Sequence, residues 1–233
     1  MPPSFKLLDF DFDLPEALIA QKPLKFRDQS RLMILDRKTQ TIDHAVFSDL
    51  PHHLPAPSLM VLNDTKVIPA RLQGHLISNG RGVEILLLRE NDDGHWEALV
   101  KGLGKLKDGV EIGFGGEPLK ATLTARQNDR AILKLTCPGD LRLVLNRVAT
   151  PPLPPYIRRD AATEENLTEL DRKRYQTVFA KHAGAIAAPT AGLHFTSKLM
   201  ESLDQGGINS AFLTLHVGVG TFQPIRSKDI REH

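Results

Sequence analysis

Hydrophobic and polar positions alternate differently along successive stretches of the chain. Near the N-terminus, apolar runs at 31–35 and 41–47 flank a polar turn, and this pattern predicts two strands. The segment 13–19 is typical of a helix, because Asp13 can cap its first turn. The wholly apolar run at 59–62 predicts a buried strand of a mixed sheet.

The middle of the chain, from about Pro69 to Arg147, has many short alternating runs separated by glycine- and asparagine-rich turns. Regularly spaced short strands favour a small antiparallel β-barrel or sandwich, and no helix is expected there. The proline-dense segment 150–155 marks a natural boundary after it. The clearest of these runs are 83–88, 96–100, 119–124 and 131–135.

The last stretch follows the order of strand, helix and strand. After a charged helix at 168–179, the run 184–188 suits a buried parallel strand, Thr196 can cap a helix that ends at Gly206, and 208–217 alternates like a strand. This order predicts a βαβ unit with adjacent parallel strands. The fold class expected is therefore α/β, with a mixed, mainly parallel sheet domain (1–68 and 151–233) and an inserted antiparallel β-barrel domain (69–150).

Two loops follow the strands of this unit, at 189–195 and 218–222, and ligands bind beyond the carboxyl ends of parallel strands. We therefore expect the two loops to lie side by side. Their histidines are candidates for proton transfer, although a histidine in an alternating strand is more often a core residue, and glycines often only shape a turn. The candidate catalytic residues are His194 and His216, and the candidate binding residues are Thr190, Gly192, Phe195, Gly218, Gly220, Thr221 and Phe222.

Other polar residues are candidates for binding a ligand or RNA, but each has an equally simple structural explanation. Asn63 and Asp64 follow the strand at 59–62 and are candidates for binding, but both are common turn formers. An aromatic ring beside arginines suits an RNA backbone or a stacked base, and a solvated surface patch is the alternative. The candidate nucleic-acid contacts are Tyr156, Arg158, Arg159 and Arg71.

Composition narrows the class of protein. The chain of 233 residues has a net charge of +2, which is too small to imply a nucleic-acid partner by itself. The only cysteine, Cys137, excludes an intrachain disulfide, and no apolar run approaches the ~18 residues of a membrane helix. No histidine or cysteine spacing is typical of a metal site, so we predict no metal. A protein of the cytoplasm is expected, since the N-terminus lacks the apolar stretch of a signal peptide.

Longer motifs go further than these patterns. The segments 187–196 and 214–222 resemble signature segments of the S-adenosylmethionine:tRNA ribosyltransferase-isomerases of queuosine biosynthesis. The same resemblance holds, in the same order along the chain, for the segments 27–32, 61–72, 152–157 and 174–178.

The resemblance implies a large α/β domain with an inserted β-barrel, and a reaction. Enzymes of this family transfer and isomerise the ribosyl moiety of S-adenosylmethionine onto 7-aminomethyl-7-deazaguanine at the wobble position of tRNA. The product is epoxyqueuosine, and adenine and methionine are released. S-adenosylmethionine is then a co-substrate and no other cofactor is expected.

Position and residue type suggest roles for single residues in this reaction. His194 or His216 would transfer protons, Phe195 and Phe222 would hold adenine, and tRNA would meet the Tyr156 segment. We expect a monomer. Family chains continue beyond the equivalent of His233, so part of the α/β domain is expected to be missing here.

Two other functions remain open on the sequence. One is a different S-adenosylmethionine- or nucleoside-dependent transferase, which would modify unmodified tRNA or a small acceptor. The other is a catalytically incomplete fragment that binds tRNA, with binding that weakens steeply with salt and no release of adenine.

Overall fold

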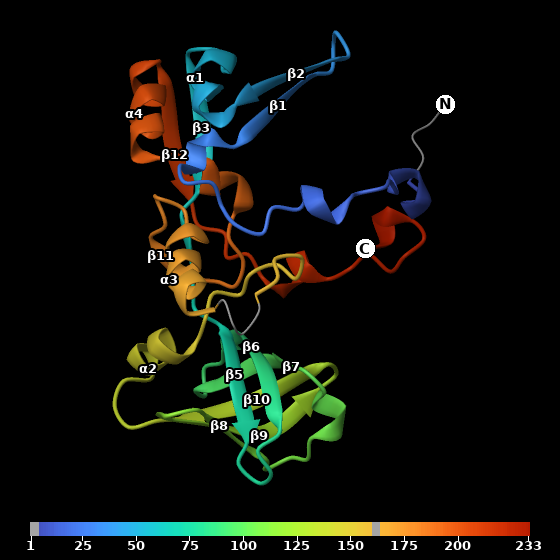
Figure 1. The fold of residues 1–233 in the computed structure, drawn as a ribbon, viewed down its shortest axis with the longest axis vertical. Coiled ribbons are helices and arrows are strands. Elements are labelled where there is room, and N and C mark those ends of the chain that lie inside the picture. Colours follow the sequence, from blue (N-terminus) through green and yellow to red (C-terminus); the bar gives the residue numbers. More distant parts are fainter. Residues whose placement is uncertain (1–4, 160–163) are drawn as a thin grey trace.

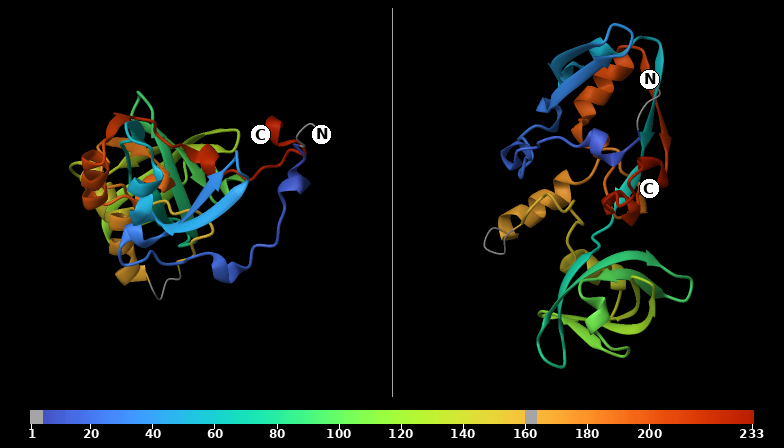
Figure 2. Two further views of the ribbon diagram at one scale, coloured as in Figure 1. Left: turned by 90° about the horizontal axis from the view of Figure 1, so that it is seen from above. Right: turned by 90° about the vertical axis from the view of Figure 1, so that its right-hand side faces the viewer.

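A β-barrel forms one end of an elongated molecule, and the α/β elements form the other (Figure 1). The computed structural model describes residues 5–159 and 164–233. The first described residues lie beside the C-terminal segment on one flank, where Lys6 pairs with Asp229 as an isolated antiparallel bridge. The right-hand view in Figure 2 shows the barrel below the rest of the molecule.

The barrel is closed and antiparallel, with the strand order β10-β7-β6-β5-β8-β9. Alternate side chains point inward, so residues such as Leu72, Ile85 and Leu133 are fully buried. Closure pairs every strand on both edges, and this removes the exposed edges of an open sheet. The strands are β5 (Arg71–Leu76), β6 (Gly82–Glu90), β7 (His95–Val100), β8 (Glu111–Phe114), β9 (Glu117–Gln127) and β10 (Arg130–Thr136).

A helix follows the barrel, where the sequence pattern predicted none. The carboxylate of Asp140 accepts a hydrogen bond of 2.8 Å from the backbone N–H of Arg142 and so caps α2 (Leu141–Val148). Val144 and Leu145 pack on the barrel core. Its apolar residues recur at helical rather than alternating spacing, and this was the signal for a helix in the sequence.

The remaining strands form three two-stranded sheets. β1 (Arg31–Asp36) and β2 (Thr41–Val46) make the predicted antiparallel hairpin. β12 (Ile208–Leu213) pairs in parallel with β3 (Ser58–Asn63), and β11 (His182–Ala185) pairs in parallel with β4 (Thr65–Val67). The predicted class, α/β with parallel sheets and an antiparallel barrel, is confirmed.

The predicted pairing of the βαβ unit is wrong, because β11 and β12 are not neighbours in one sheet. β3 and β4 follow one another with only Asp64 between them, and each takes one of the two later strands as its partner. The prediction of a buried strand at 59–62 holds only for one face, since Leu62 is buried whereas Leu59 is 64 % exposed.

Three predicted helices have different outcomes. α4 (Ser197–Gln205) is capped as expected, because the hydroxyl of Thr196 accepts a hydrogen bond of 3.1 Å from the N–H of Leu199. α3 (Glu164–Arg174) ends earlier than the predicted 168–179.

The segment 13–19 forms only a 3-10 turn, Glu16–Leu18, whose side chains are exposed and gain no burial from a longer helix. The one other α-helix of the described residues is α1 (Leu50–His53), and none of these helices is long and apolar enough to cross a bilayer.

Candidate functional site

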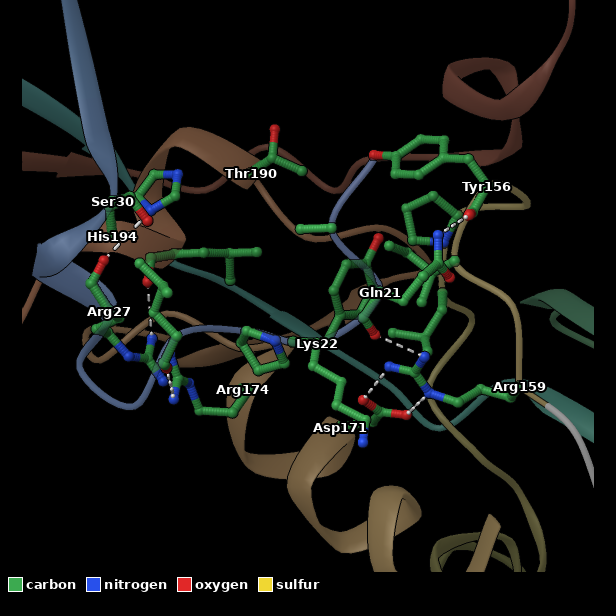
Figure 3. A pocket seen from close by; sticks show the side chains of 18 of the residues that line it. Gln21, Lys22, Arg27, Ser30, Tyr156, Arg159, Asp171, Arg174, Thr190 and His194 are labelled. Carbon is green, nitrogen blue, oxygen red and sulfur yellow. Dashed lines mark hydrogen bonds and ion pairs between the residues drawn. The ribbon is translucent and has the colours of Figure 1, made fainter. Parts of the chain in front are cut away.

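A cavity of about 440 Å³ lies between the N-terminal segment and the elements that follow the proline-rich stretch (Figure 3). One wall is the segment 20–31 before β1. The opposite wall comes from the C-terminal half of α3 and from the 3-10 helix Thr190–His194. The polar residues labelled in Figure 3 are Gln21, Lys22, Arg27, Ser30, Tyr156, Arg159, Asp171, Arg174, Thr190 and His194.

Arg27 connects the walls of this cavity, because its guanidinium donates hydrogen bonds to three backbone carbonyls. Its Nη1 donates to the carbonyl of Gln176 at 2.8 Å and to that of Leu193 at 3.2 Å, while Nη2 donates to Lys173 at 3.2 Å. The carbonyls of Lys173 and Gln176 lie in and just after the last turn of α3, where the helix carries partial negative charge and a cation is favourable. Burial, and then the nearby charge of Arg174, lower the pKa of Arg27, although a guanidinium stays protonated at neutral pH.

A buried ion pair closes the other side of the cavity. Arg159 donates from Nε and Nη2 to the two oxygens of Asp171 at 2.8 and 2.9 Å. The hydrogen bonds that Arg159 donates to Asp171 raise the pKa of Arg159. Arg159 also donates to the carbonyl of Gln21 at 2.9 Å, so the pair fixes the segment after the prolines against the N-terminal wall.

Tyr156 and Arg158 lie at the rim beside this pair. The amide of Gln21 donates to the carbonyl of Tyr156 at 3.0 Å and accepts from the N–H of Arg158 at 2.7 Å. The side chain of Arg158 pairs with Glu16 at 2.8 Å, while the Tyr156 ring is 53 % exposed. Tyr156 is therefore the rim side chain that is open to a ligand.

His194 lines the cavity near Ser30 and Arg27 (Figure 3). Its Nδ1 lies 3.4 Å from the carbonyl oxygen of Arg27, and its ring lies 5.2 Å from that of Phe47. A carbonyl only accepts, so Nδ1 carries the proton in this arrangement and Nε2 of the neutral ring keeps its lone pair. The geometry leaves His194 with a nitrogen that can remove a proton from a ligand.

Phe195 and Gly192 support this loop from beneath. Phe195 is 5 % exposed and packs edge-on against Phe47 at 5.1 Å. A Cβ on Gly192 would lie 2.9 Å from the methyl carbon of Thr177, so this position requires glycine. Thr190, by contrast, is exposed and lines the cavity.

His216 and Gly218 line a second cavity, of about 620 Å³, where the barrel and α2 meet β4 and β11. The Nδ1 of His216 lies 2.8 Å from the hydroxyl of Thr65. A Cβ on Gly184 would lie 2.7 Å from the His216 ring, so this glycine lets the ring approach the backbone. The two candidate histidines therefore belong to different cavities.

Asn63 and Asp64 connect the end of β3 to the segment after β12. Asn63 donates to the carbonyl of Leu215 at 2.8 Å and accepts from its N–H at 3.1 Å. Asp64 is 8 % exposed and accepts from the hydroxyl of Thr214 at 2.6 Å. Their polar groups are used to hold this junction.

The other predicted residues line neither cavity. Arg71 donates to the carbonyl of Leu153 at 3.0 Å, where the barrel begins. Gly220, Thr221 and Phe222 belong to the 3-10 helix Val219–Phe222, in which Phe222 is half-buried and the other two are exposed.

Sequence reasoning assigned no role to Arg27, Asp171 or Arg174. Arg27 and Arg174 stand at the first positions of two of the family-like segments, and this was the available signal. Both side chains donate hydrogen bonds to backbone carbonyls of segments that are distant in the sequence, and a local pattern does not reveal such contacts. Within residues 5–159 and 164–233, no group of three or more histidine, cysteine, aspartate or glutamate side chains could hold a metal ion.

Comparison with known proteins gives two findings. The sequence profile of the queuosine biosynthesis protein family matches residues 7–233. The crystal structure of S-adenosylmethionine tRNA ribosyltransferase from Thermotoga maritima is similar at 35 % sequence identity and a TM-score of 0.36. The match covers 91 % of this chain and 59 % of that one, so this chain spans about three-fifths of the solved relative's length.

Proposed function

Because the chain belongs to the queuosine biosynthesis protein family, we propose that it is a transferase that uses S-adenosylmethionine to modify tRNA. The proposed reaction moves and isomerises the ribosyl moiety onto 7-aminomethyl-7-deazaguanine at the wobble position, gives epoxyqueuosine, and releases adenine and methionine. The observation that carries the proposal is the profile match over nearly the whole chain. We place the reaction in the cytoplasm, with S-adenosylmethionine as co-substrate and no metal.

The chemistry needs a base, a proton for adenine and a pocket that holds both substrates. The sulfonium makes the adjacent ribose C–H acidic, so a base can remove that proton and start the expulsion of adenine. The aminomethyl nitrogen of the tRNA then attacks, and the rearranged ribose closes to an epoxide as methionine leaves. Orientation of both substrates supplies much of the rate.

We propose the 440 Å³ cavity as the site for S-adenosylmethionine. Nε2 of His194 is the base, and the guanidiniums of Arg27 and Arg174 attract the methionine carboxylate. Tyr156 at the rim, with Arg158, Arg159 and Arg71 behind it, meets the tRNA. His216 is the second proton carrier. Thr190 on the wall of this cavity, with Gly192 and Phe195 beneath its loop, completes the binding set. The remaining candidates lie outside this cavity and are kept as candidate contacts with the rest of the substrates: Asn63, Asp64, Gly218, Gly220, Thr221 and Phe222.

We also propose that the chain comprises an α/β domain (1–68 and 151–233) and an inserted barrel domain (69–150), and that it acts as a monomer. The barrel strands and the bridge between Arg71 and Thr150 support this division.

The test is turnover. The chain is incubated with S-adenosylmethionine and tRNA carrying 7-aminomethyl-7-deazaguanine, and the digested tRNA is analysed for epoxyqueuosine by mass spectrometry. His194→Gln should lower turnover about 10²- to 10⁴-fold, because a general base is lost. His53→Gln, an exposed histidine on α1, is the matched control and should turn over normally. Equal activity of the two variants would remove His194 from the mechanism.

A second candidate is tRNA binding without turnover. The exposed ring of Tyr156 at the rim of the first cavity, next to the Arg158 guanidinium, supports it. It predicts tRNA binding that weakens with salt and no adenine release under conditions where a longer relative is active.

A further inference from the structure

The ring of His216 is held by groups of β4 and β11 that the proposals above leave unused. Thr65 on β4 is fully buried, and its hydroxyl lies 2.8 Å from Nδ1 of His216. Gly184 on β11 lies against the edge of the ring, since a Cβ built there would be 2.7 Å from Cε1, 2.8 Å from Nε2 and 2.9 Å from Nδ1. His216 itself is exposed and lines the 620 Å³ cavity.

The backbone on both sides of His216 is fixed as well. The side-chain amide of Asn63 donates to the carbonyl of Leu215 and accepts from its N–H. On the other side, the carbonyl of Val217 accepts a hydrogen bond of 3.0 Å from the N–H of Ile186, just after β11. The imidazole is therefore held in one position relative to β4 and β11, which suits a group that must make a defined hydrogen bond.

Gly184 is the extra residue of a β-bulge. The parallel register of β4 and β11 shifts between Ala183 and Ala185, so Gly184 has no partner on β4. Its φ of +154° is a backbone conformation that favours glycine. A bulge changes the direction of the groups around it, and this one brings a stretch of backbone without a Cβ against the imidazole.

The buried hydroxyl of Thr65 decides which nitrogen of the neutral ring carries the proton. Among the described residues, the only hydrogen-bond partner of this hydroxyl is Nδ1 of His216, and no part of Thr65 reaches solvent. If Nδ1 carried the proton, it would donate to the hydroxyl oxygen and leave the hydroxyl hydrogen without an acceptor, which is costly in a buried place. The hydroxyl therefore donates to a lone pair on Nδ1, and the proton of the neutral ring is on Nε2.

His194 has the opposite arrangement. Its Nδ1 faces the carbonyl oxygen of Arg27, which only accepts, so its Nε2 keeps the lone pair. Nε2 of His216 is a donor instead, and it has no partner among the described residues. A ligand atom that meets it must be an acceptor, such as a carbonyl oxygen, a bare ring nitrogen or an atom that gains negative charge.

We propose that Thr65 is a positioning residue that holds the neutral ring of His216 as an Nε2–H donor at the 620 Å³ cavity, with Gly184 giving the ring its space. In the reaction proposed above, this makes His194 the base and narrows His216 to a hydrogen-bond donor that stabilises negative charge. That assignment of roles rests on the proposed function. The tautomer of His216 does not, because it can be measured without turnover.

The test is NMR of the chain with isotope-labelled histidine, above the ordinary histidine pKa of about 6.5. The ring spectra distinguish a protonated nitrogen from one with a lone pair, and the spectrum of His216→Gln identifies the signals of His216. We expect a proton on Nε2 and a hydrogen-bonded lone pair on Nδ1. Thr65→Val replaces the hydroxyl by a methyl group and should move the Nδ1 signal to that of a lone pair without a donor, whereas Thr65→Ser should keep it.

A matched control removes a hydroxyl elsewhere. Thr124→Val in the barrel loses a hydrogen bond of 3.0 Å to the carbonyl of Ile132 and should leave both ring nitrogens of His216 unchanged. In the turnover assay, Thr65→Val should lower kcat about tenfold with little change in KM, because one hydrogen bond that orients His216 is lost, and Thr65→Ser should recover most of it. Thermal unfolding of each variant checks that the fold is intact.

Three results would overturn the proposal. One is a parent chain in which Nδ1 of neutral His216 carries the proton. Another is an Nδ1 signal that is the same in Thr65→Val and in the parent chain, and the third is a normal kcat of Thr65→Val. Absence of epoxyqueuosine formation by the parent chain, with the Nε2–H tautomer and its response to Thr65→Val intact, would contradict only the proposed function.

Discussion

The barrel and the parallel strand pairs bury their apolar side chains to different extents. In the barrel, strands that are close in sequence pair around a closed ring, and Leu72, Leu87 and Leu133 are fully buried. In the β3–β12 pair, Leu59 and Val61 are 64 % and 58 % exposed. The barrel is therefore stabilised by its own core, whereas the parallel pairs depend on distant segments and on side-chain hydrogen bonds at their ends.

The largest expected effect tests this difference in burial. Leu133→Ala in the barrel should lower the free energy of unfolding by about 2–5 kcal/mol, because it leaves a cavity in a closed core. Leu59→Ala on β3 is the matched control and should change it by less than about 0.5 kcal/mol. Denaturant unfolding measures both, and equal losses would refute the distinction.

Gly184→Ala tests the tightest contact of the parallel pairs. The added Cβ would lie 2.7 Å from His216 at a backbone φ of +154°, so the substitution should cost about 1–3 kcal/mol. Gly104→Ala in the barrel has open space around it and serves as control. Unchanged stability of Gly184→Ala, measured by thermal unfolding, would mean that the histidine moves aside freely.

Helix caps show whether the two regions unfold together. Thr196→Ala removes the cap of α4 and Asp140→Ala removes the cap of α2, each at a cost of about 1 kcal/mol. Hydrogen exchange should show faster exchange near α4 for the first and near the barrel for the second. If each variant accelerates exchange in both regions equally, they form one cooperative unit.

The smallest effect concerns two ion pairs of the barrel. Hydrogen bonds from Arg89, then from Arg130, lower the pKa of Glu97, whose side chain is 8 % exposed. Its contribution is present above the ordinary glutamate pKa of about 4.3 and is lost as pH falls through the lower folded value.

Glu97→Gln should therefore flatten the loss of stability in acid and cost about 1 kcal/mol or less near neutral pH, because both arginines are solvated. Glu111→Gln, from an exposed pair with Lys120, should leave the acid profile closer to that of the parent chain. Identical acid profiles of Glu97→Gln and the parent chain would show that Glu97 contributes nothing.

The same contrast explains what the sequence could predict. Apolar and polar residues alternate along each barrel strand, and this local pattern predicted where the strands lie. The partners of β11 and β12 did not follow, because parallel pairing across more than a hundred residues leaves no local mark. His194 was a candidate from its place in a loop after a strand, and its role stays a prediction. The wall of its cavity was not predicted, since the segment 20–31 is held by carbonyl contacts of Arg27 rather than by a periodic pattern.

The bridge at the base of the barrel has a consequence for synthesis on the ribosome. Arg71 and Thr150 exchange backbone hydrogen bonds of 3.1 and 2.8 Å, so the ends of the barrel stretch are brought together once it has formed. β3 emerges from the exit tunnel long before its partner β12, so β3 stays unpaired until β12 has been synthesised. If the barrel folds before β12 is synthesised, it shortens the effective loop between β3 and β12 and so lowers the entropy cost of pairing them. Unpaired β3 is then exposed to aggregation for less time.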